Sequence, residues 1–123
     1  GKTISSVSEK LNDSTPIFEK MTFSCMRNQE LAAAIEQSGK RTIILAGIEA
    51  HICVLQTALD LCEEGYDVVL VLDAVGSRTE ENKTISVFRL QNKVALTSVE
   101  SVLFELCEEA GTEQFKKISK IIK

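Results

Sequence analysis

The segment that decides the fold is Thr42-Ile-Ile-Leu-Ala-Gly-Ile-Glu-Ala-His-Ile-Cys-Val-Leu-Gln-Thr-Ala-Leu-Asp-Leu61. Its first residues, 42–46, are β-branched and aliphatic, which predicts a buried strand. Gly47 ends that strand, and apolar residues then recur at helical spacing as far as Gly65. Cys53 is therefore expected beyond the carboxyl end of a strand, on the first turn of the following helix.

This position makes Cys53 the leading candidate for a nucleophile. Backbone N–H groups and the positive end of the helix dipole stabilise a thiolate at a helix start, and the same N–H groups can bind an oxyanion. A free cysteine is more often a buried packing residue, and Cys62 and Cys107, both late in predicted helices, fit that role. Cys25 follows a short predicted strand and is an intermediate candidate for the nucleophile.

The rest of the chain alternates between predicted strands and helices. Two Ser/Thr-x-x-Glu capping boxes, Ser77 with Glu80 and Thr97 with Glu100, are expected to begin helices. Apolar strands separated by helices predict an α/β fold, a three-layer sandwich with a parallel sheet, and residues 1–123 are expected to form a single domain. Further strands are expected at 17–22, 67–72 and 94–96, and further helices at 28–38, 79–91, 97–109 and 113–122.

The segment around the cysteine also follows a known pattern. Gly47-Ile48-Glu49-Ala50-His51-Ile52-Cys53-Val54, with Thr57-Ala58 behind it, resembles the signature of the isochorismatase-like cysteine hydrolases. The similarity continues in residues 18–25, 65–74, 77–78 and 97–103, in the family's order. The resemblance spans nearly all of the chain and implies a Rossmann-like isochorismatase fold.

The resemblance implies a catalytic triad of cysteine, aspartate and lysine. Cys53 matches the cysteine, and Lys20, inside a Phe-x-Lys-x-x-Phe-Ser pattern, matches the lysine. The family's aspartate lies on its first strand, in an aliphatic run followed by Asp-x-Gln, and no such run precedes Phe18. The resemblance therefore implies that these residues are the C-terminal two-thirds of the domain, without its first two strands, and that hydrolysis needs what is missing. The strand at 17–22 is then expected to lie apart from the remaining sheet.

The resemblance also implies details of the backbone near the nucleophile. It predicts a cis peptide bond between Ile48 and Glu49, with the N–H groups of Glu49 and Cys53 forming an oxyanion hole. His51, the single histidine, is a weaker candidate for substrate binding, because the family's base is the aspartate. For Asp73, Ser77 and Arg78, which follow the next strand, the expected role is to structure loops or to contact another subunit.

The expected function is hydrolysis of a small-molecule amide or a related C–N bond through a cysteine nucleophile and a thioester. A catalytically inactive family member that acts as an assembly or binding partner is the alternative. A nucleotide-binding α/β domain remains open because it would share the fold class, but it is disfavoured, since no glycine-rich phosphate loop follows any predicted strand. The resemblance further implies a homo-oligomer, a dimer or larger.

Composition excludes several other classes of protein. The net charge of −4 gives no electrostatic footprint for nucleic acid. No apolar run approaches the roughly 20 residues that span a bilayer, so no membrane partner is expected. Four irregularly spaced cysteines with one histidine predict neither a zinc site nor a disulfide framework, and no cofactor or metal is predicted. A reducing cytoplasm is the expected compartment.

Overall fold

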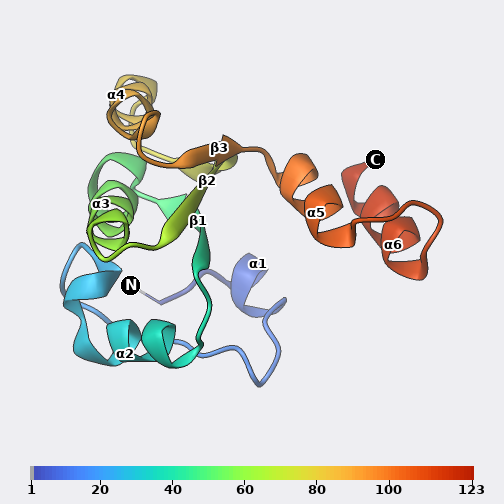
Figure 1. Cartoon of the computed structure of the whole chain (residues 1–123), viewed down its shortest axis with the longest axis horizontal. Coiled ribbons are helices and arrows are strands. Elements are labelled where there is room, and N and C mark those ends of the chain that lie inside the picture. Colours follow the sequence, from blue (N-terminus) through green and yellow to red (C-terminus); the bar gives the residue numbers. More distant parts are fainter. Residues whose placement is uncertain (1) are drawn as a thin grey trace.

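The computed structural model describes residues 2–123, and at their centre lies a parallel sheet of three strands. The strands are β1, Thr42–Ile48, β2, Asp67–Gly76, and β3, Ala95–Thr97, in the spatial order β1-β2-β3. Helices lie on both sides of the sheet, with α3 and α4 on one side and the α5–α6 pair on the other (Figure 1). The predicted α/β architecture with a parallel sheet is confirmed.

The helices of residues 2–123 follow the sequence prediction closely. Each long helix begins and ends within about two residues of its predicted bounds, except that the helix after β1 starts later than expected. Gly39, with φ of 66°, ends the first long helix in a conformation that favours glycine. The helices are α1, Ser5–Ser8, α2, Gln29–Gln37, α3, Leu55–Glu63, α4, Glu80–Leu90, α5, Val99–Cys107, and α6, Glu113–Ile122, with a 3-10 turn η1 at Cys25–Arg27 and a π-helical turn η2 at Ala50–Val54.

The predicted capping boxes are wrong by one or two residues. Thr79 caps α4, where its side chain accepts a hydrogen bond from the Asn82 N–H at 3.2 Å. Ser98 caps α5 and accepts from the Ser101 N–H at 3.1 Å. The cap must be the extended residue directly before the first helical one, and Thr79 and Ser98 occupy that position.

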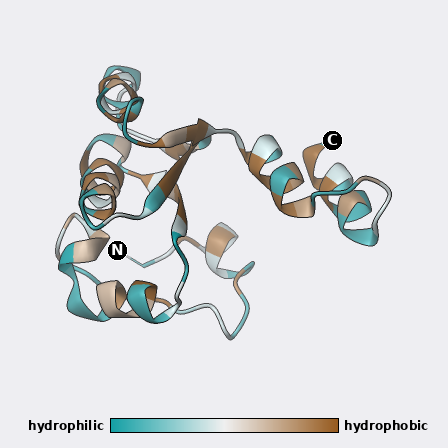
Figure 2. Ribbon diagram, viewed as in Figure 1, coloured by the Kyte–Doolittle hydropathy of each residue, from teal (hydrophilic) through white to brown (hydrophobic). Residues whose placement is uncertain are grey.

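The core lies between the sheet and helices α3 and α4. Leu61 and Leu90 have no exposed surface and Leu70 on β2 is 2% exposed. Figure 2 shows apolar residues concentrated on β2 and on the sides of the helices that face it. Burial of these aliphatic side chains is the main favourable contribution to folding, at about 25 cal/mol per Å² of apolar surface removed from water.

The strand predicted at 17–22 is wrong, because this segment is irregular and pairs with no strand among residues 2–123. Its apolar side chains are largely exposed, with Ile17 at 66% and Met21 at 98%. A β-strand needs a neighbour to accept and donate its backbone hydrogen bonds, and β1 at the sheet edge is bonded only to β2. The segment therefore lies apart from the sheet, as the family resemblance implied.

Strands β1 and β2 extend two and four residues beyond the ends expected for them. After an irregularity between Leu45 and Gly47, pairing resumes between Gly47 and Val75 and between Ile48 and Gly76. Both strands therefore end at the same edge of the sheet. Across residues 2–123, no helix is both long enough and apolar enough to cross a membrane.

The buried position of Leu61 predicts a large cost of truncation. We expect Leu61→Ala to lower the free energy of unfolding by about 2–5 kcal/mol, since it leaves a cavity against the sheet. The matched control is Leu106→Ala on α5, where the side chain is 69% exposed and the expected change is within about 0.5 kcal/mol. Urea denaturation measures both, and equal losses would contradict this description of the core.

Candidate active site

Cys53 lies in the π-helical turn η2, between the end of β1 and the start of α3. The Glu49 carbonyl accepts hydrogen bonds from the N–H groups of Ile52 at 3.1 Å and Val54 at 3.2 Å, and the second bond makes the turn π-helical. The expected position on the first α-helical turn is therefore wrong in detail, because α3 begins only at Leu55. Cys53 is half-buried at the carboxyl edge of the sheet.

Two backbone features lead from β1 into this turn. Gly47 has φ of 119°, a conformation that side chains other than glycine rarely adopt. The Ile48–Glu49 peptide bond is cis. The Ile48 side chain is 73% exposed, whereas the Glu49 side chain is only 25% exposed and turns toward the loop after β2.

Lys20 is held inside its own loop. Its Nζ donates hydrogen bonds to the carbonyl oxygens of Thr22 at 2.8 Å and Phe23 at 2.9 Å. Thr22 Oγ1 donates in turn to the Ser24 carbonyl at 2.8 Å. Among residues 2–123, no hydrogen bond joins Lys20 to Cys53, the two predicted catalytic residues.

Hydrogen bonds hold the segment after Lys20 against α3, the helix that follows Cys53. The Cys25 N–H donates to Thr57 Oγ1 at 2.9 Å, and the Arg27 guanidinium donates two hydrogen bonds to Asp60, at 2.9 and 3.1 Å. Thr57 and Asp60 are three residues apart within α3, which places them on one face of that helix. Sequence reasoning missed these contacts, although the spacing was a usable signal.

Two of these groups have shifted pKa values. The hydrogen bonds from Arg27 hold the pKa of the Asp60 carboxyl below its usual range, and the same pairing raises the pKa of the guanidinium. Burial raises the pKa of the Cys62 thiol, and the nearby Lys93 offsets only part of that rise. Cys62 is therefore a poor nucleophile, which fits the packing role predicted for it.

A polar network joins the end of β1 to the loop after β2. Glu49 Oε2 accepts a hydrogen bond from the Arg78 N–H at 2.9 Å and lies 3.8 Å from Arg78 Nε. His51 Nδ1 lies 2.9 Å from Ser77 Oγ and 3.6 Å from Glu49 Oε2. Further along the sheet, Asp73 Oδ1 accepts from the Val99 N–H at 2.8 Å. These bonds connect loops, the structuring role expected from the sequence.

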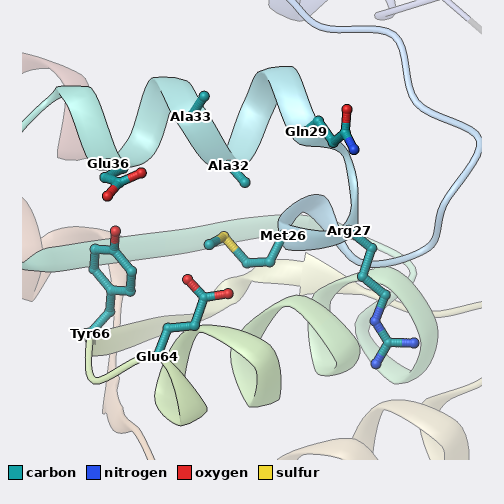
Figure 3. Close-up of a pocket in the computed structure, with 8 residues that line it drawn as sticks. All are labelled: Met26, Arg27, Gln29, Ala32, Ala33, Glu36, Glu64 and Tyr66. Atoms are coloured by element: carbon teal, nitrogen blue, oxygen red, sulfur yellow. The ribbon is translucent and has the colours of Figure 1, made fainter.

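A hollow of about 500 Å³ lies elsewhere, between α2 and the turn from α3 to β2. Glu36, Glu64 and Tyr66 point into it from the two sides, and Met26 lines its floor (Figure 3). Tyr66 directly precedes β2, so the hollow lies at the amino end of that strand, opposite Cys53. In the described part of the chain, no group of three His, Cys, Asp or Glu side chains is placed to hold a metal ion.

The sequence of residues 3–101 matches the isochorismatase domain. The chain belongs to the isochorismatase family. It is 42% identical to the secreted isochorismatase effector Isc1 of Phytophthora sojae, over all of this chain and 60% of that protein. It is 38% identical to isochorismatase domain-containing protein 1 of Danio rerio, over 87% of this chain and 38% of that protein.

Solved structures of family members share the fold. The MAR1 ribonuclease of Caenorhabditis elegans superimposes with a TM-score of 0.89 and 35% identity, over 99% of this chain and 62% of its own. The YcaC gene product of Escherichia coli, described as an octameric hydrolase of unknown specificity, superimposes with a TM-score of 0.81 and 26% identity, over 89% of this chain and 54% of its own. The chain thus spans about 60% or less of these relatives, and its family supports a hydrolase-type function.

The Arg27–Asp60 pair predicts a pH-dependent contribution to stability. Because the pKa of Asp60 is lowered in the folded state, its contribution is complete above an ordinary aspartate pKa of about 4 and is lost as the pH falls below it. We expect Arg27→Gln to lower the free energy of unfolding slightly at pH 7, and the difference from the native protein to shrink as the pH falls below about 4 and Asp60 becomes protonated. Arg89→Gln on the exposed face of α4 is the control, and a pH-independent difference for Arg27→Gln would contradict the pairing.

The cysteines predict an order of thiol reactivity. Cys53 lies in a turn at the start of a helix, whereas burial raises the pKa of the Cys62 thiol. We expect limiting iodoacetamide to alkylate Cys53 before Cys62 in the folded protein, as measured by peptide mass mapping. The denatured protein is the control, since all four thiols should then react alike. Faster alkylation of Cys62 in the native state would remove the basis for a nucleophile at position 53.

Proposed function

We propose that the protein hydrolyses an amide or a related C–N bond of a small molecule, with Cys53 as the nucleophile. The observation that carries the proposal is the position of Cys53, in the turn that joins the carboxyl end of β1 to the start of α3. Ligands of open parallel sheets bind beyond the carboxyl ends of the strands. The Cys53 thiolate attacks the carbonyl carbon, a tetrahedral oxyanion forms, the amine leaves, and water hydrolyses the thioester.

Lys20 and two backbone N–H groups complete this proposal. The N–H groups of Glu49 and Cys53 bind the oxyanion, the role that the family resemblance assigns to them. Lys20 supplies positive charge near the thiol, which favours the thiolate. Support comes from the hydrogen bond that the Cys25 N–H, in the segment after Lys20, donates to Thr57 on α3, four residues after Cys53. A proton must also reach the leaving nitrogen, a step that the family resemblance assigns to an aspartate.

Two other functions compete with this one. The first is a catalytically inactive protein that acts as an assembly or binding partner. It is favoured by the state of Lys20, because both hydrogen bonds of its ammonium go to backbone carbonyls and not to a catalytic group. A ribonuclease is suggested by the name of the C. elegans neighbour. The net charge of −4 disfavours RNA, because the phosphate backbone is bound mainly by clustered Lys and Arg.

We further propose that the protein is a homo-oligomer in a reducing compartment such as the cytoplasm. The octameric E. coli neighbour supports the first part, together with exposed Leu106 at 69% and Ile121 at 75% on the α5–α6 pair. All four thiols are free, which suits a reducing compartment, although one relative is named as a secreted effector. Light scattering of the purified protein measures the number of subunits.

The proposed nucleophile predicts the effect of a single-atom change. We expect Cys53→Ser to lower kcat/KM toward a cleaved small amide by more than about 10³-fold, because a hydroxyl is a far weaker nucleophile than a thiolate. Lys20→Met is expected to cause a smaller loss. The panel of substrates includes small primary and secondary amides and a short RNA, each followed by product chromatography.

Cys62→Ser is the matched control and is expected to retain activity. Undiminished amide hydrolysis by Cys53→Ser would refute the nucleophile. Cleavage of RNA in preference to every amide would favour the ribonuclease, and binding of an amide without turnover by the native protein would favour the inactive partner.

A further inference from the structure

Helix α4 has two faces that differ in burial. Its inner face packs on α3, β2 and the turn η2, and there Ser86 is 1% exposed and Leu90 has no exposed surface. The opposite side carries two large apolar side chains, Ile85 at 49% and Phe88 at 64% exposure. Figure 1 shows α4 at the outer end of the molecule. Within residues 2–123, this outer face of α4 is therefore left open to solvent.

Charged residues flank the two apolar side chains on the outer face. Glu81 lies four residues before Ile85, and Arg89 directly follows Phe88. Helical spacing places positions 81, 85, 88 and 89 within about one third of the helix circumference. Glu81 and Arg89 are both exposed, and neither forms an ion pair with another of the described residues. The outer face thus has a negative end, an apolar centre and a positive end.

This order of charges is complementary to itself. Positions 81 and 89 are equally far from position 85. If a second copy of α4 lies antiparallel to the first, about a two-fold axis near Ile85, Glu81 faces Arg89 of the partner subunit at both ends. Parallel helices would instead place acid against acid and base against base. A two-fold interface uses the same patch on both subunits, so it requires this kind of self-complementarity. Antiparallel helices also bring opposite ends of their dipoles together.

We propose that the outer face of α4 is a two-fold interface between two copies of this chain. Ile85 and Phe88 form its centre, and Glu81 pairs with Arg89 of the partner subunit at each end. The proposal gives the homo-oligomer proposed above a specific surface, separate from the α5–α6 pair, and it does not depend on hydrolysis.

The length of α4 limits the strength of this contact. The helix has 11 residues and is therefore about 16 Å long. One such pair of helices buries less than the roughly 1,200 Å² at the lower limit of a standard interface. We therefore expect a weak dimer, which dissociates at the dilute concentrations of a denaturation experiment.

Charge reversal tests the antiparallel register. Glu81→Arg and Arg89→Glu each replace two attractive pairs with two repulsive ones, because the two-fold axis repeats every contact. We expect each single variant to raise the dissociation constant of the dimer by about tenfold or more, as measured by sedimentation velocity over a range of concentrations. The double variant exchanges the two charges and is expected to restore the dissociation constant to within about threefold of the native value.

Two matched controls separate this contact from general effects of charge and apolar surface. Glu30→Arg also reverses an exposed acid in the first turn of a helix, α2, and should leave association unchanged. Phe88→Ser should weaken association, whereas Phe23→Ser should not, although Phe23 is similarly exposed at 58%. Circular dichroism of each variant verifies that its helices are intact.

Three outcomes would overturn the inference. A native protein that stays monomeric at every concentration would remove both this interface and the proposed homo-oligomer. An oligomer that both single charge reversals leave intact would keep the homo-oligomer on another surface and remove this interface alone. A folded double variant that does not regain association would contradict the antiparallel pairing. None of these results bears on the role of Cys53, which is tested by hydrolysis.

Discussion

The parallel pairing of β1 with β2 is the constraint on which the rest of the site depends. The register of the two strands shifts between Leu45 and Gly47, after which Gly47 pairs with Val75 and Ile48 with Gly76. Because both strands run in the same direction, their carboxyl ends open at one edge of the sheet. The turn that carries Cys53 and the loop that carries Ser77 and Arg78 therefore begin side by side, although they are about 25 residues apart in the chain.

This shared edge allows one carboxylate to hold two loops. Glu49 follows β1 directly, and the Arg78 N–H that it accepts lies just beyond the end of β2. The carboxylate bonds to a backbone group whose position is fixed by the sheet, so the geometry of His51 is set by strand pairing rather than by a flexible side chain. A second set of contacts, from Cys25 to Thr57 and from Arg27 to Asp60, fastens the Lys20 segment to α3 in the same way. Hydrogen bonds to the sheet edge and to α3 thus hold the two segments on either side of the Cys53 turn.

Several large apolar side chains of the protein lie on its surface and not in its core. Ile44 and Ile48 on the edge strand β1 are 43% and 73% exposed, while Leu70 on β2 is almost fully buried. Apolar residues also lie on the outer sides of α5 and α6 (Figure 2). An edge strand with exposed aliphatic side chains offers unpaired backbone groups and apolar area together, which is the kind of surface that proteins cover with another chain segment or subunit.

The amino-acid sequence by itself determined the order of elements, because hydrophobic period and helix-stop signals are local. The last helix, Glu113–Ile122, was predicted at its observed bounds, and the signature from Gly47 to Val54 identified the family. Tertiary structure decided what depends on a neighbour. Among the described residues 2–123, the segment 17–22 finds no strand to pair with and is irregular. Ser77 contacts His51, while Thr79 caps α4. Contacts between distant residues also produce the hydrogen bonds from Cys25 and Arg27 to α3, the network around Glu49 and the π-helical turn at Cys53. No local pattern in the sequence records such contacts.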